Sequence, residues 1–426
     1  MVAEHFLPAA GRFCMGLLLA CACASVQAQA WTLESSIERA TTVAPELRVG
    51  EAEVGARAGE LTQAGAWPNP TVELRTDEKL GIDDGRGGYS LSQVSITQPI
   101  PLRRLAHQRR AAEAGLESAR AGQRHQRLQL ETRTAQAFHA LQLAAERRRL
   151  AEERLKFAEG LRPGIDLHGA DRLVRYLSPL ERARLDILRE NARQDVALAE
   201  GKWSEAASQF RALLALAPDA QPETTSLTPF AAPAALAELL DRLATHPALR
   251  AVQQSRTASR ANVDIARSQR FADPTVSVFR EQDYLAGSRQ DYTGFMLGVQ
   301  IPLWNLNGGG VARAVAEADK AEALLAAQQR DLESRLRQNH LHLGHLIEQA
   351  EHYRTRLLVP ARQLLDLTRK GFATGEQNGL ALVDASNTYF DAQARYLELL
   401  HDAWFEAAEL RLAAGISLAS GMAVQP

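Results

Sequence analysis

The pattern of hydrophobic and polar residues predicts two very long helices. The stretches 102–162 and 303–359 contain no proline and are rich in Ala, Leu, Arg, Gln and Glu. These residues favour helix, whereas a proline in mid-helix would break it. Each stretch therefore predicts a helix of about 57 residues, which would extend roughly 85 Å. Two further proline-free stretches, 180–217 and 380–414, predict a second helix in each half of the chain.

The second long stretch carries a heptad repeat. Steps of four and three residues from Val311 meet an apolar residue at every position except Glu322, Gln329 and Asn339. Such a seam has to be buried against a partner helix, so we expect two helical hairpins that pack as a coiled-coil bundle. The positions of this predicted seam are Val311, Val315, Ala318, Glu322, Leu325, Gln329, Leu332, Leu336, Asn339, Leu343, Leu346, Ala350, Tyr353 and Leu357.

The segments between prolines predict β-hairpins at about 71–99 and 275–301, because apolar and polar residues alternate there and Gly or Asp separates the runs. The alternating apolar positions are Val72, Leu74, Val276, Val278, Phe295, Leu297 and Val299. Strands of about ten residues are long enough to cross a bilayer at a tilt. The alternative is a pair of hairpins that lie on a helical body and never enter lipid.

A membrane-spanning sheet would need more than one copy of the chain. A strand in lipid cannot leave its backbone edge unpaired, so the sheet must close. Four strands are too few for a closed barrel, which begins near eight strands, whereas three copies would give twelve. The predicted fold class is therefore mainly α with a small β part: a tandem-repeat, long-helix α-barrel with four strands per chain that contribute to a 12-stranded trimeric transmembrane β-barrel.

Ordered matches between the two halves indicate a tandem duplication. Trp67-Pro68-Asn69-Pro70 corresponds to Phe271-Ala272-Asp273-Pro274, and Ile100-Pro101-Leu102 corresponds to Ile301-Pro302-Leu303. The matches recur about 200 residues apart and in the same order, which chance similarity does not produce. The predicted domains are a first repeat at 31–230 with its helical hairpin at about 103–217, a second repeat at 231–415 with its helical hairpin at about 308–414, and a tail at 416–426.

Composition narrows the class of protein. The chain has 426 residues, a formal net charge of −2 and a hydrophobic fraction of 46%. A nucleic-acid binder would carry a basic excess, and a disordered chain would be less hydrophobic, so we expect no nucleic-acid partner and an ordered protein. No apolar run beyond residue 30 approaches the roughly 20 residues of a membrane-spanning helix, which excludes a polytopic helical membrane protein.

The N-terminus reads as a secretory signal peptide over residues 1–30. A short apolar run ends at Ala28-Gln29-Ala30, a typical cleavage site. Lipid attachment at Cys21 and a buried N-terminal helix are the alternatives. All three cysteines, Cys14, Cys21 and Cys23, precede the cleavage site, so the mature chain would have no disulfide, thiolate metal site or cysteine nucleophile.

The duplicated plan, the aromatic-x-(Asn/Asp)-Pro motif before each hairpin and the Gln-Pro-x-Pro motif after the first resemble the TolC-type outer membrane efflux proteins. Trp67-Pro68-Asn69-Pro70, Gln98-Pro99-Ile100-Pro101-Leu102 and the basic Arg103-Arg104 are most similar to the branch that exports cobalt, zinc and cadmium. The resemblance implies a homotrimeric duct through the outer membrane lipid and the periplasm of a Gram-negative cell. Its implied partners are a periplasmic adaptor (membrane fusion protein) and an inner-membrane pump of the RND type, and its implied cargo is heavy-metal cations. Drugs or secreted proteins are the rival cargo, and a periplasmic coiled-coil adaptor or scaffold is the rival function.

The segment 372–385 resembles the family's helical tip. Relatives carry two acidic residues that ring the periplasmic opening; here only Asp384 is acidic, because Ala381 occupies the other position. Phe372 and Gln377 replace a tyrosine and a basic residue that help to close the opening in relatives, so the resemblance makes Asp384, Phe372 and Gln377 gate or pore candidates. The alternative for Asp384 is a favourable charge near a helix start. Candidates for the adaptor-docking tips are Gly164, Gly169, Asp171, Gly371, Gly375, Gly379 and Val383.

The sequence offers few candidates for a metal, phosphate-binding or catalytic site. Four histidines, His340, His342, His345 and His352, do not gather on one turn of a helix, so we expect no metal site. The run 308–310 of three glycines lacks the Lys-Ser/Thr of a phosphate loop and predicts a flexible joint between strand and helix. We expect neither a cofactor nor an enzyme. At the start of each hairpin, Trp67 and Phe271 would either anchor in the membrane interface or pack at the corner between helix and strand.

Overall fold

The computed structural model describes residues 30–77, 91–161, 178–285 and 288–419. The predicted signal peptide and the first helical tip, with Gly164, Gly169 and Asp171, lie outside these residues. The first half contains α1 (Leu33–Val43), α2 (Pro45–Ala64), β1 (Thr71–Asp77), β2 (Leu91–Pro99), α3 (Arg104–Gly160) and α4 (Pro179–Leu214). The second half contains α5 (Leu236–Asp241), the 3-10 turn Arg242–Thr245, α6 (Pro247–Ser268), β3 (Thr275–Leu285), β4 (Ser288–Gly298), α7 (Gly308–Tyr353), the π turn Arg354–Leu358, α8 (Val359–Thr374) and α9 (Gly379–Ala414).

Local sequence signals explain where several helices begin. Proline occupies the first turn of α2, α4 and α6, where its missing N–H is not needed. At α4 the Ser178 hydroxyl accepts the Glu181 N–H while the Glu181 carboxylate accepts the Ser178 N–H, a reciprocal cap. The long helix α3 confirms the predicted 57-residue helix of the first half.

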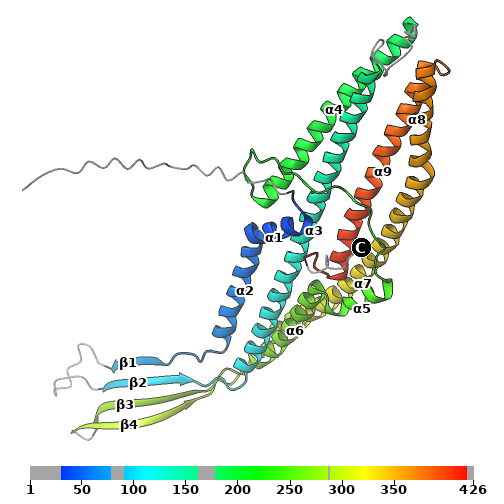
Figure 1. Ribbon diagram of the computed structural model, residues 1–426. Coiled ribbons are helices and arrows are strands. Elements are labelled where there is room, and N and C mark those ends of the chain that lie inside the picture. Colours follow the sequence, from blue (N-terminus) through cyan, green and yellow to red (C-terminus); the bar gives the residue numbers. More distant parts are fainter. Residues whose placement is uncertain (1–29, 78–90, 162–177, 286–287, 420–426) are drawn as a thin grey trace, which may run out of the picture.

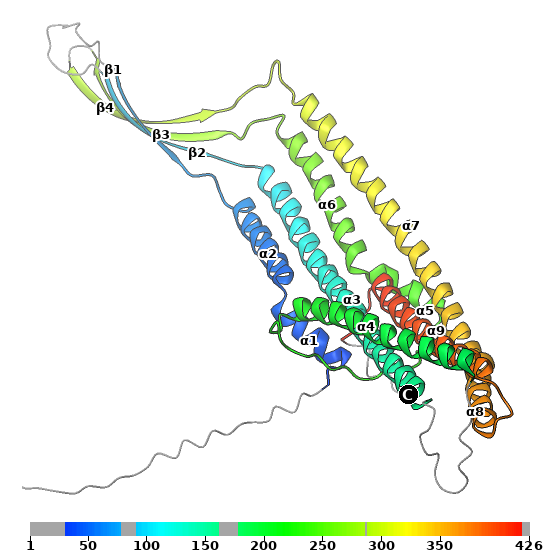
Figure 2. The same ribbon diagram turned by 90° about the horizontal axis from the view of Figure 1, so that it is seen from above.

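The molecule is elongated, with the four strands at one end and the α8–α9 tip at the other (Figures 1 and 2). Helix α3 runs through the middle and packs against α1, α2, α4, α6 and α9. The largest apolar core lies between α7 and α9 and includes Leu336, Leu343 and Leu400. A second core gathers α1, α3 and α4 around Phe138 and Phe210. In the part of the chain that is described, no helix has an apolar stretch long enough to cross a bilayer.

Two predictions about the second long helix are wrong. Gly308–Gly310 form the first turn of α7 rather than a joint before it. At the other end the helix does not stop near Pro360: it passes through the π turn Arg354–Leu358 and continues to Thr374. The Val359 N–H bonds to the Arg354 carbonyl, five residues back. This wider turn lets the helix accommodate a proline, which lacks an N–H and crowds the preceding turn.

The predicted heptad seam is confirmed over the central part of α7. In the part of α7 that lies nearer the sheet, the buried positions differ by one residue from the predicted ones. Helix α7 buries Leu325, Leu332, Leu336, Leu343, Leu346 and Ala350. Towards the sheet it buries Ala314 and Ala321 in place of Val315 and Glu322. The partner there is α6 rather than α9, and Glu322 instead pairs with Arg260 of α6 at 2.7 Å.

The strands form one antiparallel sheet in the order β1-β2-β3-β4, so β1 and β4 are its edges. Directly paired residues lie on the same face. One face carries the row Val72, Ile96, Val278 and Phe295, all exposed. The opposite face is mostly polar and carries Thr71, Thr97, Ser277, Glu73, Ser95, Arg75 and Gln93, together with the apolar Phe279 and Met296. The predicted alternation is therefore confirmed up to Leu297, whereas Val299 lies beyond the end of β4.

Candidate functional site

The turn between α8 and α9 forms the described helical tip, and glycines fix its shape. Gly375 has φ +86°, a left-handed conformation that favours glycine. The Gln377 N–H donates to the Gly371 carbonyl at 3.0 Å, which closes the turn. A Cβ on Gly371 would lie 2.7 Å from Cγ of Gln377. The geometry of the turn thus favours glycine at both Gly371 and Gly375.

Glu181 joins the starts of α4 and α9. Besides capping α4, its Oε1 accepts the Gly379 N–H at 3.1 Å. A Cβ on Gly379 would lie 3.4 Å from Cγ of Glu181, at the edge of ordinary van der Waals contact. The two helical hairpins are therefore tied at the tip by one carboxylate. Sequence reasoning missed Glu181; the Ser-x-x-Glu pattern of Ser178 and Glu181 would have predicted its capping role but not its contact with α9.

Phe372 and Val383 are half-buried where the four tip helices meet. Both contact the apolar cluster of Ala158, Leu185 and Leu188, contributed by α3 and α4. Phe372 also contacts the cluster that contains Leu365 and Leu382, contributed by α8 and α9. These contacts give Phe372 and Val383 a packing role within a single copy.

Asp384 differs from these residues because it is exposed. It is the sixth residue of α9 and so lies beyond the first turn, where the helix dipole stabilises acidic groups most. Besides the hydrogen bonds of the helix, its backbone carbonyl accepts the Thr388 hydroxyl at 2.9 Å. Across the described ranges its carboxylate forms no ion pair. The Asp384 carboxylate is therefore open to solvent.

Arg154 links three of the tip helices just behind Asp384. Its guanidinium on α3 donates to Asp195 of α4 at 2.8 Å and to Asn387 of α9 at 2.7 Å. One planar guanidinium on α3 thus bonds to both α4 and α9 close to Asp384.

Aromatic and apolar side chains are exposed where the sheet meets the helices. Trp67 and Phe271 are exposed, so neither packs at the corner within one copy. The structure adds Trp304, which is 93% exposed, together with Ile301, Leu303 and Leu306. Sequence reasoning used the Ile-Pro-Leu motif only to align the repeats and missed this group, although its run of apolar residues was visible.

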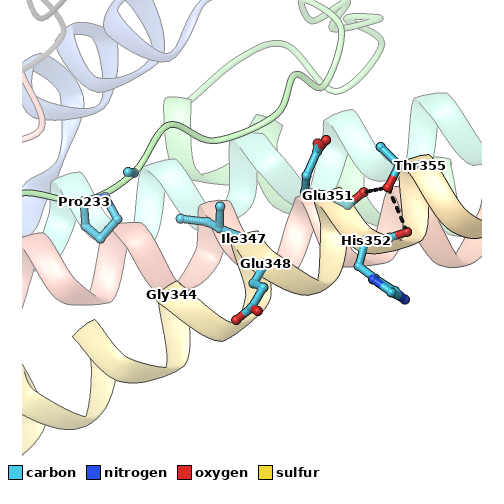
Figure 3. Close-up of a pocket in the computed structure, with 8 residues that line it drawn as sticks. Pro233, Gly344, Ile347, Glu348, Glu351, His352 and Thr355 are labelled. Atoms are coloured by element: carbon cyan, nitrogen blue, oxygen red, sulfur yellow. Dashed lines mark hydrogen bonds between the residues drawn. The ribbon is translucent and has the colours of Figure 1, made fainter.

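The histidines of α7 are dispersed. The His340 ring lies 3.1 Å from the Ala234 carbonyl, and His342 lies 3.8 Å from the carboxylate of Glu406. His352 and Glu348 border a shallow groove between α7 and Pro233, and both side chains point away from the proline (Figure 3). Among the described residues, no group of three or more His, Cys, Asp or Glu side chains could hold a metal ion.

A buried histidine holds the segment that links the two halves. His139 of α3 donates through Nδ1 to Oε1 of Gln142 at 2.8 Å and stacks on Trp404 of α9, with ring centroids 4.8 Å apart. Gln142 in turn donates to the Thr225 carbonyl, and Trp404 donates to the Thr228 carbonyl, each at 2.7 Å. Burial lowers the pKa of His139 to about 4.

This burial predicts a loss of stability in acid. The pKa of His139 lies below its unfolded value of 6.5, so the stability is complete above pH 6.5 and falls as the pH drops towards 4. At pH 4 the loss amounts to about 3 kcal/mol. Burial also lowers the pKa values of His125 and His246, which adds to the trend. We expect the thermal unfolding midpoint in detergent to fall from pH 7 to pH 4.5, and to fall less steeply in His139→Gln. Replacement of the exposed His345 by Gln should leave the slope unchanged; equal slopes in all three proteins would contradict the prediction.

Comparison with known proteins gives consistent matches over most of the chain. Residues 36–162 and 240–416 match the family described as outer membrane efflux protein. The chain is 27% identical over 380 residues to the cobalt-zinc-cadmium resistance protein CzcC of Cupriavidus metallidurans, covering 87% of this chain and 86% of that protein. It is 29% identical over 313 residues to the nickel and cobalt resistance protein CnrC of the same organism, covering 70% of each.

Solved structures share the fold at low sequence identity. A crystal structure of CusC has a TM-score of 0.70 and 17% identity, and it covers 90% of this chain and 92% of its own. The open state of the Neisseria gonorrhoeae MtrE outer membrane channel has a TM-score of 0.72 and 18% identity, with 91% and 89% covered. The predicted combination of long helices and a four-stranded sheet therefore has close structural counterparts.

Proposed function

Because the chain belongs to the outer membrane efflux protein family, we propose that it is the exit duct of a three-part efflux system that exports heavy-metal cations. In this proposal three copies form a β-barrel in the outer membrane and a helical barrel across the periplasm. A periplasmic adaptor docks at the helical tips, and an inner-membrane pump of the RND type supplies the energy. The protein itself supplies a passive passage.

The two-faced sheet is the observation that carries the proposal. A face with the continuous apolar row Val72, Ile96, Val278 and Phe295 suits lipid. The opposite face is mostly polar, with Phe279 and Met296 as its apolar exceptions, and suits a water-filled lumen. The edges β1 and β4 have no partner strand among the described residues of the chain. In lipid these edges have to be paired, which other copies of the chain would do. Trp67 and Phe271 would then lie near the membrane interface, where aromatic residues are enriched.

Metal cations as cargo are supported by the names of the relatives and by the chemistry of Asp384. The two relatives described above are a cobalt-zinc-cadmium and a nickel and cobalt resistance protein. In a threefold ring, three exposed Asp384 carboxylates would attract cations and resist anions. Phe372 and Gln377 would border this ring, while Gly371, Gly375, Gly379 and Val383 would shape the surface that meets the adaptor.

Deletion of the gene tests the proposal. We expect the deletion strain to lose tolerance to cobalt, zinc or cadmium and to regain it on complementation, with drug tolerance unchanged. If the deletion strain lost only its tolerance to drugs, the cargo would be drugs and not metal cations. Recovery of the protein as a monomer in the soluble periplasmic fraction would reject the duct function and favour the alternative of a periplasmic coiled-coil scaffold.

Asp384→Asn should reduce the cation preference of the reconstituted channel. Removal of three carboxylates takes away about 1 kcal/mol of screened attraction, so the cation-to-anion permeability ratio should fall about fivefold. The measurement is the reversal potential across a planar bilayer with a salt gradient. Asp366→Asn, which removes an exposed carboxylate from α8, is the matched control. An unchanged permeability ratio in Asp384→Asn would show that Asp384 does not line the pore.

A further inference from the structure

The exposed apolar residues of β4 do not stop where the strand ends. Phe295 and Leu297 lie on the apolar face of the sheet. Val299, Ile301 and Leu303 follow at the same two-residue spacing and are all at least 63% exposed. No strand pairs with this segment in the described part of the chain. The apolar surface thus continues from the sheet into the segment that leads to α7.

In the opposite direction the same face turns polar. Arg280 follows Val276 and Val278 on this face of β3, further from the helices. Its guanidinium lies 3.4 Å from the Asp291 carboxylate of β4, and the Gln282 amide donates to the same carboxylate at 2.6 Å. The apolar surface of β3 and β4 is therefore limited on that side and extends towards the helices.

The other three segments that connect strands to helices bring apolar side chains to the same end of the sheet. One row of paired residues crosses all four strands just before this end, so the connecting segments begin at one level (Figure 2). The residues of this row are Thr71, Thr97, Ser277 and Met296. We call the most exposed apolar residues of the connecting segments the collar: Trp67, Leu102, Phe271, Ile301, Leu303 and Trp304. An exposed apolar group of this kind marks a surface that meets lipid or another protein.

Two arginines border the collar on the side of the helices. Arg103 directly follows Leu102 at the start of α3. Arg270 directly precedes Phe271 at the end of α6. Both arginines are exposed, and neither forms an ion pair with a described residue. Each therefore presents a full positive charge beside an exposed apolar side chain.

The carboxylates that lie nearest in the sequence do not cancel this charge. Asp273 pairs with Arg104 at 2.8 Å, and Asp264 pairs with Arg267 at 3.6 Å. The first of these ion pairs also joins the segment before α3 to the segment after α6, which brings the two exposed arginines to the same region. The helix side of the collar thus keeps a positive charge that suits an anionic partner.

An apolar surface bordered by arginines has the profile of one leaflet of a bilayer, in which acyl chains are followed by phosphate groups. We propose that the collar enters the periplasmic leaflet of the outer membrane and that Arg103 and Arg270 bind the phosphate groups of anionic phospholipids there. The inference rests on the proposed function, because it takes the apolar face of the sheet to lie in lipid and the helices to lie in the periplasm. The planar guanidinium of arginine binds two phosphate oxygens at once. A zwitterionic headgroup carries an ammonium that repels it, so anionic lipids are preferred.

Trp304 reports whether the collar lies in the leaflet. The purified protein is reconstituted into phosphatidylcholine vesicles that contain phosphatidylcholine brominated on its acyl chains, which quenches tryptophan fluorescence on contact. We expect Trp304→Phe to remove part of the quenching and Trp203→Phe, in the helical body, to remove none, because Trp203 packs with the core around Phe210. Unchanged quenching in Trp304→Phe would show that Trp304 is shielded from lipid, which overturns the inference and leaves the duct intact.

The headgroup preference is measured with brominated phosphatidylglycerol in place of brominated phosphatidylcholine. One contact between an arginine and an anionic headgroup should enrich phosphatidylglycerol near Trp304 about fivefold. The preference should be lost in the variant with Arg103→Gln and Arg270→Gln and kept when both are replaced by Lys. Arg335→Gln with Arg362→Gln is the matched control, because it removes two exposed arginines of α7 and α8 that form no ion pair with a described residue.

The outcomes separate this inference from the proposed function. Equal quenching by the two lipids, or a preference that survives Arg103→Gln with Arg270→Gln, overturns the phosphate site and leaves the duct intact. Quenching by brominated phosphatidylcholine checks that each variant is inserted. If the glutamine variant is not inserted, salt provides the test: added NaCl should weaken the preference of the unchanged protein, and a preference independent of salt overturns the site. Failure of the unchanged protein to enter vesicles overturns both the duct and this inference.

Discussion

Ile96→Lys is expected to keep the protein out of the outer membrane. Ile96 lies at the centre of the apolar face, paired with Val72 on one side and Val278 on the other. A lysine at the lipid-facing midplane of a β-barrel costs about 2–4 kcal/mol, and three copies would multiply this to roughly 6–12 kcal/mol per trimer. The measurement is the fraction of the protein that is recovered in outer membranes and migrates as a trimer without boiling.

The neighbouring residue provides the control. Ser95 lies on the polar face opposite Glu73, where a lysine would face a carboxylate and the lumen. Ser95→Lys should therefore reach the membrane and assemble at the level of the unchanged protein. If both lysine variants assembled equally well, the faces of the sheet would not differ in environment and the membrane assignment would fail.

Glu131→Ala is expected to release the C-terminal segment from the helical body. Glu131 is buried in α3, and its carboxylate accepts the Ser417 hydroxyl at 2.7 Å and the Leu418 N–H at 2.9 Å. Loss of two bonds to a charged acceptor, with the Leu418 N–H left buried, should lower the free energy of unfolding by about 3 kcal/mol or more. The denaturant midpoint in detergent measures the loss, and limited proteolysis should cut near residue 418 first.

Arg127→Ala separates this role from simple charge pairing. Arg127 contacts the same carboxylate at 3.3 Å but its side chain is mostly exposed. The Arg127 end of this pair lies in solvent, and the Glu131 carboxylate keeps its two bonds to the C-terminal segment, so this variant should lose no more than about 1 kcal/mol. Equal losses for Glu131→Ala and Arg127→Ala would show that the ion pair, and not the C-terminal segment, is what the carboxylate stabilises.

The long helices could be predicted because their signals are local. A long stretch of helix-forming residues without proline correctly predicted α3. The heptad repeat correctly predicted the buried side of α7 from Leu325 to Ala350. The prediction that the second long helix ends near Pro360 was wrong. A proline breaks a helix only where no wider turn can accommodate it. The prediction of a flexible joint at residues 308–310 was wrong because these glycines belong to the first turn of α7. The start of α7 packs against α6, and local helix propensity does not reveal this packing.

The tip could be predicted only in part. Family resemblance pointed to Gly371, Gly375 and Gly379, and the structure gives a geometric reason for glycine at Gly371 and Gly375. It could not separate Phe372 and Val383, which pack within the chain, from Asp384, which does not, because burial depends on contacts between distant helices. The bond between Gly379 and Glu181 joins residues far apart in the sequence, and no local pattern encodes such a pair.

In the proposed threefold assembly, the bond between Glu181 and Gly379 would also resist widening of the periplasmic mouth. Any motion that swings α9 away from α4 must first separate this carboxylate from the Gly379 amide. The bond is charge-assisted and worth about 1.5–3 kcal/mol, and a threefold assembly would contain it three times. Dilation of the mouth would therefore begin against a threshold of several kcal/mol, and whatever docks at the tip would have to supply a competing donor for Glu181.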